Sequence, residues 1–423
     1  MKKLGFGLMR LPLKSGDQKD VDVGEVCRMA DKFIENGFTY FDTAYMYHGG
    51  ESERVFRRAV AERYERNRYT VASKMPPFLM KEEADNDRIF SEQLERTGAG
   101  YFDYYLIHSL SEENYALAKK FRCFEFAERK KKEGLIKELG FSFHDTADVL
   151  ETILNERPDV DFVQLQINYL DWEDEGVQSR RCYETCVKHG KKVAVMEPVK
   201  GGMLANLPQK AAEALQAYAP ERSVASWAIR FAAGLENVFC VLSGMSDMRQ
   251  LEDNISYMKD FRPLSGGEKA VLAGALETIK ASVAVPCTGC RYCVDGCPKK
   301  IAIPDYFALY NNYERFSRSF DPSFAFGNIA KEGGLPSDCI ACGSCERHCP
   351  QYIGVVAEMK KSPPPLKKRR SGRERHGQGE SAPLRGQGAR RSGRKDVYVR
   401  RKRDKGALRA GGKKGASRRG RRG

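Results

Sequence analysis

Eight of the thirteen cysteines in this 423-residue chain fall into two runs with the same spacing. The first run consists of Cys287, Cys290, Cys293 and Cys297, followed by Pro298. The second run consists of Cys339, Cys342, Cys345 and Cys349, followed by Pro350. Both read C-x2-C-x2-C-x3-C-P, the spacing with which thiolates hold cubane iron–sulfur clusters. The pattern therefore predicts two [4Fe–4S] clusters in the last third of the chain.

The spacing also predicts which cysteines share a cluster, because in two-cluster proteins the fourth cysteine of each run ligates the other cluster. One cluster is expected on Cys287, Cys290, Cys293 and Cys349. The other is expected on Cys339, Cys342, Cys345 and Cys297. Disulfides and zinc are the alternatives. Zinc sites are usually built from two CxxC pairs, and the third cysteine and the proline of each run do not fit that pattern.

The charge of the chain is concentrated at its C-terminal end. Residues 360–423 hold 25 lysines and arginines and four acidic residues, whereas the remainder has 47 basic and 53 acidic residues. From Ser362 the chain is rich in Lys, Arg, Gly, Ser and Pro and poor in large apolar residues, which predicts disorder. Basic segments bind nucleic acid through phosphates, but Tyr398 is the one aromatic residue for base stacking. We favour a tail without function, or a misread reading frame, over nucleic-acid binding.

The N-terminal segment does not resemble an export signal. Arg10 and Pro12 interrupt its apolar stretch, and no small-residue cleavage site follows. No run of 18 apolar residues occurs, so no membrane span is expected. Together with cluster-type cysteine spacing, these features favour a reducing cytoplasm as the location of the protein.

Strand-like and helix-like segments alternate along the first 260 residues, which predicts a parallel sheet. We expect strands at Leu4–Gly7, 39–42, 69–73, 103–107, 137–141, 161–166, Lys192–Met196 and 238–242. We expect helices at 23–36, 53–65, 87–97, 125–132, 146–155, 178–189 and 248–259. Eight such units match the size of a (β/α)8 TIM barrel. The alternative, an open doubly wound sheet, usually carries an early GxGxxG loop, and none follows a strand here.

The expected domains follow from these patterns. A barrel is predicted over residues 1–262 and a connecting helix over 263–284. A small, mainly helical two-cluster domain is predicted over 285–358, including a helix near 301–316, and the basic tail over 359–423.

A barrel gathers its functional groups at the C-terminal ends of its strands. Four polar residues stand there: Asp42 ends the second strand, Tyr47 follows in the next loop, Lys74 closes the third strand and His108 the fourth. Each has an ordinary explanation when taken singly, as a cap, a surface aromatic, a solvated lysine or a core histidine. Their shared position at one rim favours a site.

These segments resemble the aldo-keto reductases. The matching stretches are Phe41-Asp42-Thr43-Ala44-Tyr45-Met46-Tyr47, Ala72-Ser73-Lys74 and Leu106-Ile107-His108, with support from 139–142, Val163-Gln164 and 242–245 running to Asp253-Asn254. With the cysteine-rich extension, the chain is similar to the branch of that family that carries a ferredoxin-type domain. The resemblance covers roughly residues 1–358.

The resemblance implies hydride transfer between NADP(H) or NAD(H) and a small carbonyl or alcohol substrate. It implies that Tyr47 is the general acid and that Lys74, paired with Asp42, stabilises the phenolate. It also implies that His108 hydrogen-bonds the carbonyl oxygen or relays the proton.

The resemblance also implies contacts to the nicotinamide cofactor. Ser142 and Gln164 are expected at the carboxamide, with Gln166 as an alternative to Gln164 in the strand register. Gly201 lies in the 197–202 loop expected over the pyrophosphate. The adenosine end is expected at Gly244, Ser246, Gln250, Asp253 and Asn254. Family members often carry basic residues at the positions of Gly244 and Gln250, and Arg249 is the neighbouring residue that could replace them.

Hydride donors and cubane clusters differ in the number of electrons they exchange, because a nicotinamide gives two together and a cluster takes one. The clusters could pass electrons to or from a redox partner protein or a flavin, act on the substrate in single-electron steps, or only stabilise their domain. We favour electron transfer. The alternatives to an enzyme are an electron-transfer subunit whose barrel is a docking scaffold, and a nucleic-acid-binding protein that uses the tail.

Overall fold

The computed structural model describes residues 2–174, 177–315 and 323–361. The chain divides into two units, 1–369 and 370–423, and the second lies entirely outside the described residues. The predicted disorder and the nucleic-acid alternative of the basic tail therefore fall outside them as well.

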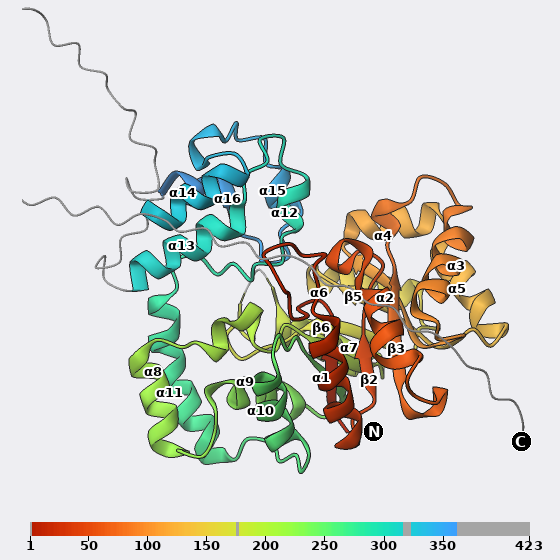
Figure 1. The fold of residues 1–423 in the computed structure, drawn as a ribbon, viewed down its shortest axis with the longest axis horizontal. Helices are drawn as coiled ribbons and strands as arrows, with labels where there is room; N and C mark the ends of the chain where they lie inside the picture. Colours follow the sequence, from red (N-terminus) through yellow and green to blue (C-terminus); the bar gives the residue numbers. More distant parts are fainter. Residues whose placement is uncertain (1, 175–176, 316–322, 362–423) are drawn as a thin grey trace, which may run out of the picture. The chain divides into compact units, whose positions relative to one another are not determined.

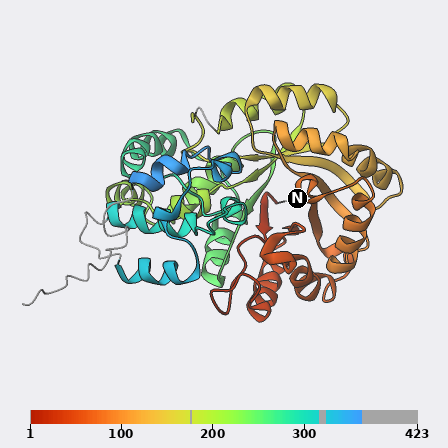
Figure 2. The ribbon, with the colours of Figure 1, turned by 90° about the horizontal axis from the view of Figure 1, so that it is seen from above.

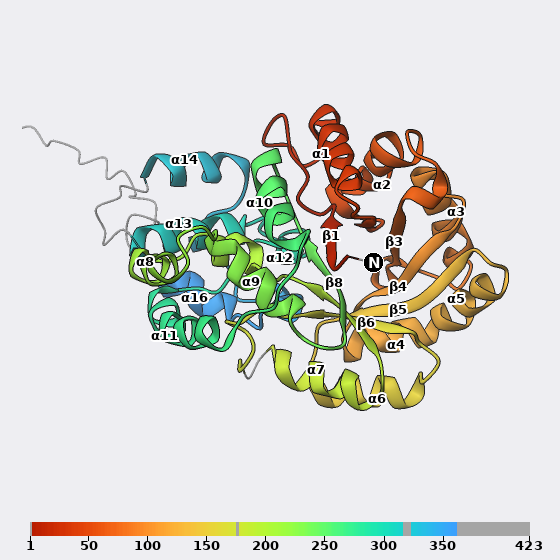
Figure 3. The ribbon, with the colours of Figure 1, turned by 90° about the horizontal axis from the view of Figure 1, so that it is seen from below.

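Eight parallel strands form a closed barrel in chain order, with β1 paired to both β2 and β8. The strands are β1 (Leu4–Gly7), β2 (Tyr40–Asp42), β3 (Thr70–Met75), β4 (Phe102–Leu110), β5 (Ile136–Phe143), β6 (Phe162–Gln166), β7 (Lys192–Met196) and β8 (Val238–Ser243). Figure 3 shows these strands around a common centre, with helices outside them. The predicted TIM barrel is confirmed.

Alternation of side chains along each strand produces two cores. The inner core fills one part of the barrel and consists of Tyr40, Ala72, Leu106, Phe162, Ala194, Cys240 and Leu242. The outer core lies between strands and helices, and Val71 belongs to it although its neighbour Ala72 points inward. Because the inner-core side chains pack inside the barrel, ligands are left with the loops at the strand ends.

A ring of helices covers the barrel (Figure 2). They are α1 (Val23–Glu35), α2 (Ser52–Phe56), α3 (Asp85–Thr97), α4 (Glu112–Lys120), α5 (Cys123–Lys132), α6 (Ala147–Glu156), α7 (Ser179–Lys188), α8 (Gln209–Tyr218), α9 (Val224–Ala233) and α10 (Met248–Met258). Side-chain caps begin several of them: Asp22 accepts a hydrogen bond from Glu25 N, and Asp247 from Gln250 N.

The helix predictions differ from the structure in two respects. The helix expected over 53–65 is interrupted, because α2 ends at Phe56 and a π-helical turn follows over Arg57–Ala61. Sequence periodicity also missed α4, α8 and α9. In α9 seven of the ten residues are buried, polar Ser226 and Arg230 among them, so no simple amphipathic stripe marks this helix.

The long helix α11 (Gly266–Ser282) joins the barrel to the C-terminal domain. It begins with a capping box between Ser265 and Glu268, and Arg230 of the barrel binds the same glutamate with two hydrogen bonds of 2.5 and 3.0 Å. Burial of Arg230 beside Glu268 gives a partly desolvated, bidentate pair. The helix is thereby fixed to the barrel at its first turn.

The C-terminal domain is mainly helical, as predicted (Figure 1). Its helices are α12 (Tyr292–Asp295), α13 (Ile303–Arg315), α14 (Ser323–Glu332), α15 (Ser344–Arg347) and α16 (Val355–Lys361). They enclose a separate core in which Val285, Ile301, Tyr306 and Ile353 pack with cysteines of both runs. Helix α14 was not predicted. Within the described ranges, no helix is long and apolar enough to cross a membrane.

Candidate active site

A cavity of about 460 Å³ opens at the C-terminal ends of the barrel strands. Eleven of the twelve predicted catalytic and cofactor residues line it: Asp42, Tyr47, His108, Ser142, Gln164, Gly201, Gly244, Ser246, Gln250, Asp253 and Asn254. The twelfth, Lys74, is fully buried beside Asp42. The structure therefore brings the predicted residues to one mouth.

Asp42 and Lys74 form a buried ion pair. The Lys74 ammonium donates to Asp42 Oδ1 at 2.5 Å and to the Thr43 carbonyl at 2.7 Å. The other carboxylate oxygen of Asp42 accepts from Gln164 Nε2 at 3.2 Å. Burial is the largest influence on both groups, raising the pKa of Asp42 and lowering that of Lys74, while their mutual attraction opposes both shifts.

Tyr47 lies in the short 3-10 turn η1 (Tyr47–Gly50), near both Lys74 and His108. Its ring meets the His108 ring edge-on, with 6.0 Å between centroids, and the Lys74 nitrogen lies 5.0 Å from the Tyr47 centroid. Burial raises the pKa of Tyr47 well above its ordinary value, and the charges of Asp42 and Glu197 raise it further. The phenol is therefore protonated over the physiological range.

The expectation that Lys74 stabilises the Tyr47 phenolate stays a prediction. Burial is the largest cause of the raised pKa, and the negative charge of Asp42, which lies beside Lys74, adds to it. Arg10 is the cation that opposes the rise in the Tyr47 pKa.

His108 is a buried, neutral histidine. Burial lowers its pKa well below the ordinary value, and the positive charge of Lys74 and the nearby His144 ring act in the same direction. Its Nδ1 is buried without a hydrogen-bond partner among the described residues. A neutral imidazole at the cavity wall can donate a hydrogen bond to a ligand oxygen without adding a charge.

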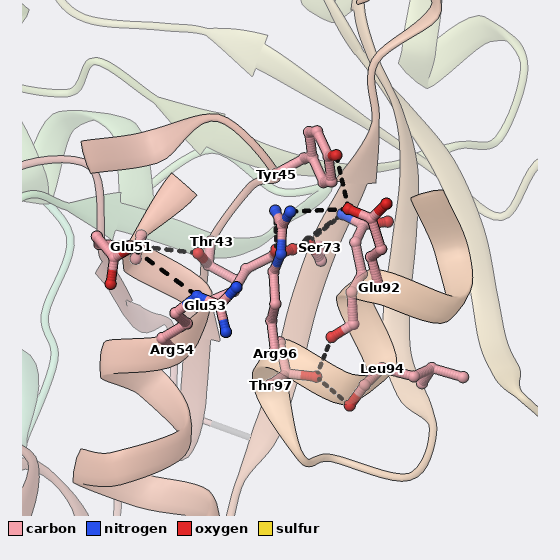
Figure 4. A network of polar contacts seen from close by, with 12 residues as sticks. Thr43, Tyr45, Glu51, Glu53, Arg54, Ser73, Glu92, Leu94, Arg96 and Thr97 are labelled. Atoms are coloured by element: carbon pink, nitrogen blue, oxygen red, sulfur yellow. Dashed lines mark hydrogen bonds and ion pairs between the residues drawn. The ribbon is translucent and has the colours of Figure 1, made fainter. Parts of the chain in front are cut away.

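A second layer of hydrogen bonds supports the end of β3 (Figure 4). Ser73 donates to the buried carboxylate of Glu53 at 2.6 Å. Gln93 donates to the same carboxylate oxygen at 2.9 Å and to the Lys74 carbonyl at 3.0 Å. Arg96 lies 3.7 Å from the second Glu53 oxygen. These bonds fix the backbone on which Lys74 stands.

The two residues predicted for the carboxamide of nicotinamide lie on adjacent strands, with Ser142 of β5 paired in register to Gln164 of β6. Ser142 Oγ accepts from Ser109 N at 2.7 Å, which leaves its hydroxyl hydrogen available to a ligand. Gln164 is held by Asp42, whereas Gln166 binds Asp171 and Gln351. Both glutamines line the cavity.

The predicted adenosine end is ordered by its own hydrogen bonds. Gln250 Oε1 accepts from Ser246 N at 2.9 Å, Asn254 donates to Ser243 Oγ at 2.7 Å, and Asp253 accepts from Ser223 Oγ at 2.7 Å. Arg249 does not line the cavity: its side chain is 91% exposed and is paired with Asp247. It therefore does not replace the absent basic side chains at this end.

Sequence reasoning missed several residues that line the cavity. Arg10 follows β1 and could have been found by the same strand-end rule that found Asp42. Four further lining residues belong to the C-terminal domain, and only the tertiary structure shows that they reach the cavity: Thr288, Cys290, Tyr292 and Gln351.

The eight cysteines of the two runs surround two small hollows in the crossed arrangement. One hollow, here called the proximal hollow, is lined by Cys287, Cys290, Cys293 and Cys349. The other, the distal hollow, is lined by Cys297, Cys339, Cys342 and Cys345. The backbone amides of Gly289 and Ala341 donate to Cys287 and Cys339 at 3.4 Å, a matching contact in each run.

The donor set fits cubane clusters better than disulfides or zinc. All thirteen cysteines are unbridged. In the part of the chain that the structure describes, no three His, Cys, Asp or Glu side chains converge as one metal ion requires. Thiolates spread around a hollow suit a cluster with iron at several corners.

The proximal hollow shares a wall with the cavity at the barrel mouth. Thr288, Cys290 and Gln351 line both. Gln351 Oε1 accepts from Lys200 Nζ at 2.6 Å, and the same ammonium donates to Asp171 at 2.6 Å. This buried network links the segment after Cys349 of the second cysteine run to the loop after β7.

The chain was compared with known families and structures. The family model described as Aldo/keto reductase family matches residues 3–268. The chain belongs to the aldo/keto reductase family. A second model, described as 4Fe-4S dicluster domain, matches residues 286–353, so the family barrel here carries an iron–sulfur domain at its C-terminal side. The resemblance inferred from the motifs is confirmed. A comparison with curated proteins found no match.

Solved aldo-keto reductases share the barrel fold. The holo form of AKR11C1 from Bacillus halodurans is 22% identical, with a TM-score of 0.52 over 64% of this chain and 91% of that one. An enzyme from Klebsiella pneumoniae in complex with NADPH is 22% identical, with a TM-score of 0.52 over 64% and 90% of the chains. At this identity the likeness establishes the fold.

Proposed function

We propose that this protein is an NAD(P)H-dependent oxidoreductase that reduces an aldehyde or ketone, or catalyses the reverse reaction. The observation that supports the proposal is the single cavity that brings Tyr47, His108 and the Asp42–Lys74 pair together at the mouth of an aldo/keto reductase barrel. A nicotinamide dinucleotide, when bound, supplies or accepts the hydride, and the structure of the Klebsiella pneumoniae enzyme in complex with NADPH supports that class of cofactor.

The side chains of the cavity have distinct roles in the proposal. Tyr47, protonated because of its burial, donates its proton to the carbonyl oxygen as negative charge develops there. Neutral His108 donates a hydrogen bond to the same oxygen and orients the substrate. The Asp42–Lys74 pair places a positive group beside the phenol ring as the proton leaves.

The two cysteine sets are proposed to hold two [4Fe–4S] clusters that transfer electrons. A cluster in the proximal hollow would supply single electrons at the wall of the cavity, because Cys290 belongs to both. In the distal hollow Cys342 is exposed, which would give a redox partner protein access to a ligand of the second cluster. A reducing cytoplasm is the proposed compartment.

Substitution of Tyr47 by Phe tests the proposal. The protein is prepared anaerobically with its iron, and NADPH and NADH oxidation is followed with a panel of aldehydes and ketones. We expect Tyr47→Phe to reduce kcat by about 10²- to 10⁴-fold, since it removes the proton donor, with little change in dinucleotide affinity. Wild-type turnover that is unaffected by Tyr47→Phe would contradict the proposal. If the wild type turns over no carbonyl but its clusters exchange electrons with a partner, the barrel is a docking scaffold.

A further inference from the structure

The lining of the cavity is poor in positive charge. Three carboxylates line it, those of Asp42, Glu197 and Asp253, and Arg10 is the one lysine or arginine among its described lining residues. A nicotinamide dinucleotide carries at least the two negative charges of its pyrophosphate. Binding such an anion beside three carboxylates requires a cation or an equivalent set of N–H donors.

Arg10 stands where a phosphate would be expected. It lies three residues beyond the end of β1, and its carbonyl accepts from Ser246 Oγ at 2.8 Å. A Cβ built at Gly244 would lie 3.1 Å from Arg10 Cδ, so the arginine side chain occupies the space that a side chain after β8 would fill. The guanidinium lies 3.5 Å from Glu197, which follows β7.

Barrel enzymes frequently bind phosphate at the loops after the seventh and eighth strands. Arg10 contacts both loops from the first one. Its guanidinium also donates to the Thr288 carbonyl at 2.9 Å, within the first cysteine run. Its side chain keeps 31% of its surface exposed, so it is held in position and is still accessible to a ligand.

The other nearby cations are either paired with buried groups or exposed to solvent. Lys74 is paired with Asp42, and Lys200 is buried between Asp171 and Gln351. Arg249 is directed into solvent. Because Gly244 has no side chain and Gln250 no charge, the loop after β8 contributes no cation of its own to the cavity wall.

We propose that Arg10 is the cation that binds the dinucleotide phosphates, reaching over Gly244 from the β1 loop to the loops after β7 and β8. The inference rests on the proposed use of a nicotinamide dinucleotide. Glu197 and the Thr288 carbonyl hold the guanidinium, and an incoming phosphate competes with Glu197 for it. The residue is assigned to binding and not to proton transfer.

The test measures affinity and not turnover. The iron-loaded protein is titrated anaerobically with NADH and with NADPH, by ligand fluorescence, at low and high salt. We expect Arg10→Gln to weaken dinucleotide binding by about 10- to 100-fold, as loss of a charged hydrogen bond implies. Arg10→Lys should retain part of the affinity. The matched control Arg249→Gln should change it less than about twofold, since an exposed pair contributes little.

Ionic strength separates a charge effect from a structural one. Salt weakens charge–charge attraction, so the affinity of the wild type should fall with salt more steeply than that of Arg10→Gln. Equal losses in Arg10→Gln and Arg10→Lys, with unchanged salt dependence, would refute the inference and assign Arg10 to fixing the Thr288 loop. Unchanged dinucleotide affinity in Arg10→Gln would also refute the inference. If at the same time the KM of carboxylate-bearing substrates rises, Arg10 binds the substrate and not the dinucleotide.

A second measurement avoids substitution altogether. Phenylglyoxal labelling of Arg10 in the wild type, followed by peptide mass spectrometry, should be slowed by NADH but not by adenosine or nicotinamide alone. Equal labelling with and without a bound dinucleotide would overturn the inference. A wild type that binds neither NADH nor NADPH would instead remove the proposed function on which the inference rests.

Discussion

Gln166 and Gln351 bind each other through two reciprocal hydrogen bonds of 3.0 and 2.8 Å, although 185 residues separate them in the chain. Gln166 ends β6 of the barrel, and Gln351 follows the last cysteine of the second run by two positions. Both side chains are buried. The pair therefore connects the wall of the candidate active site to the segment that carries a proximal-hollow cysteine.

Removal of the Gln351 carboxamide should destabilise the protein. Gln351→Leu removes one of two buried partners from Gln166 and from the Lys200 ammonium, which both keep Asp171, and such a loss costs about 1–3 kcal/mol. Urea unfolding of the iron-loaded protein, followed by tryptophan fluorescence, measures the change. The control Tyr352→Phe removes an exposed hydrogen bond to the His144 carbonyl and should cost less than about 1 kcal/mol. Equal stability of Gln351→Leu and the wild type would show that the network is dispensable.

Two adjacent glycines allow the contact between the β7 loop and the first cysteine run to be tested separately from backbone strain. Gly201 and Gly202 both have positive φ, of +64° and +97°. A Cβ at Gly201 would lie 2.2 Å from the Thr288 carbonyl oxygen, whereas a Cβ at Gly202 meets nothing within 4 Å. Gly201→Ala should therefore lower the thermal midpoint more than Gly202→Ala, by the cost of displacing the Thr288 loop. A larger loss in Gly202→Ala would contradict this contact.

Paired cysteine substitutions test the crossed ligand sets. Two [4Fe–4S] clusters give about eight iron atoms per chain. Because Cys290 and Cys349 line the same hollow, the double variant Cys290→Ala/Cys349→Ala should lose one cluster and keep about four iron atoms. Cys290→Ala/Cys297→Ala interrupts both hollows and should lose both clusters. Analysis of iron and acid-labile sulfide gives the number of clusters that each variant retains. If Cys290→Ala/Cys297→Ala retains more iron than Cys290→Ala/Cys349→Ala, each run holds its own cluster.

Stability should fall on the acid side because of His144. Burial lowers its pKa to about 4 in the folded protein, whereas an unfolded histidine titrates near 6.5. Between these values the unfolded chain binds the extra proton, so stability is complete above about pH 6.5 and decreases as the pH falls toward 4. The decrease is at most about 1.4 kcal/mol per pH unit for one proton. The thermal midpoint should change less between about pH 7.5 and 5 in His144→Gln than in the wild type. An equal change of the midpoint with pH in both proteins would show that His144 does not cause the loss of stability in acid.

The sequence alone determined the barrel and predicted the cysteine sets, because both depend on short-range patterns. Strand Leu4–Gly7 and strand Lys192–Met196 were predicted with the bounds that the structure has. The strand-end rule placed Asp42, Lys74 and His108 at one rim, since parallel strands in a closed barrel all end on the same side. Local patterns could not show that Asp42 and Lys74 lie within hydrogen-bond distance, because the distance between two side chains 32 residues apart is a product of packing.

Only the tertiary structure decided which groups from distant segments complete the cavity. Arg10 reaches over Gly244 because a glycine leaves that volume empty, and no spacing rule relates two residues 234 positions apart. Cys290 and Gln351 enter the cavity wall because buried amide and ion-pair contacts hold the C-terminal domain against the loops of the barrel. Cysteine spacing specifies a cluster, whereas the side chains that a cluster faces depend on how separately formed elements pack together.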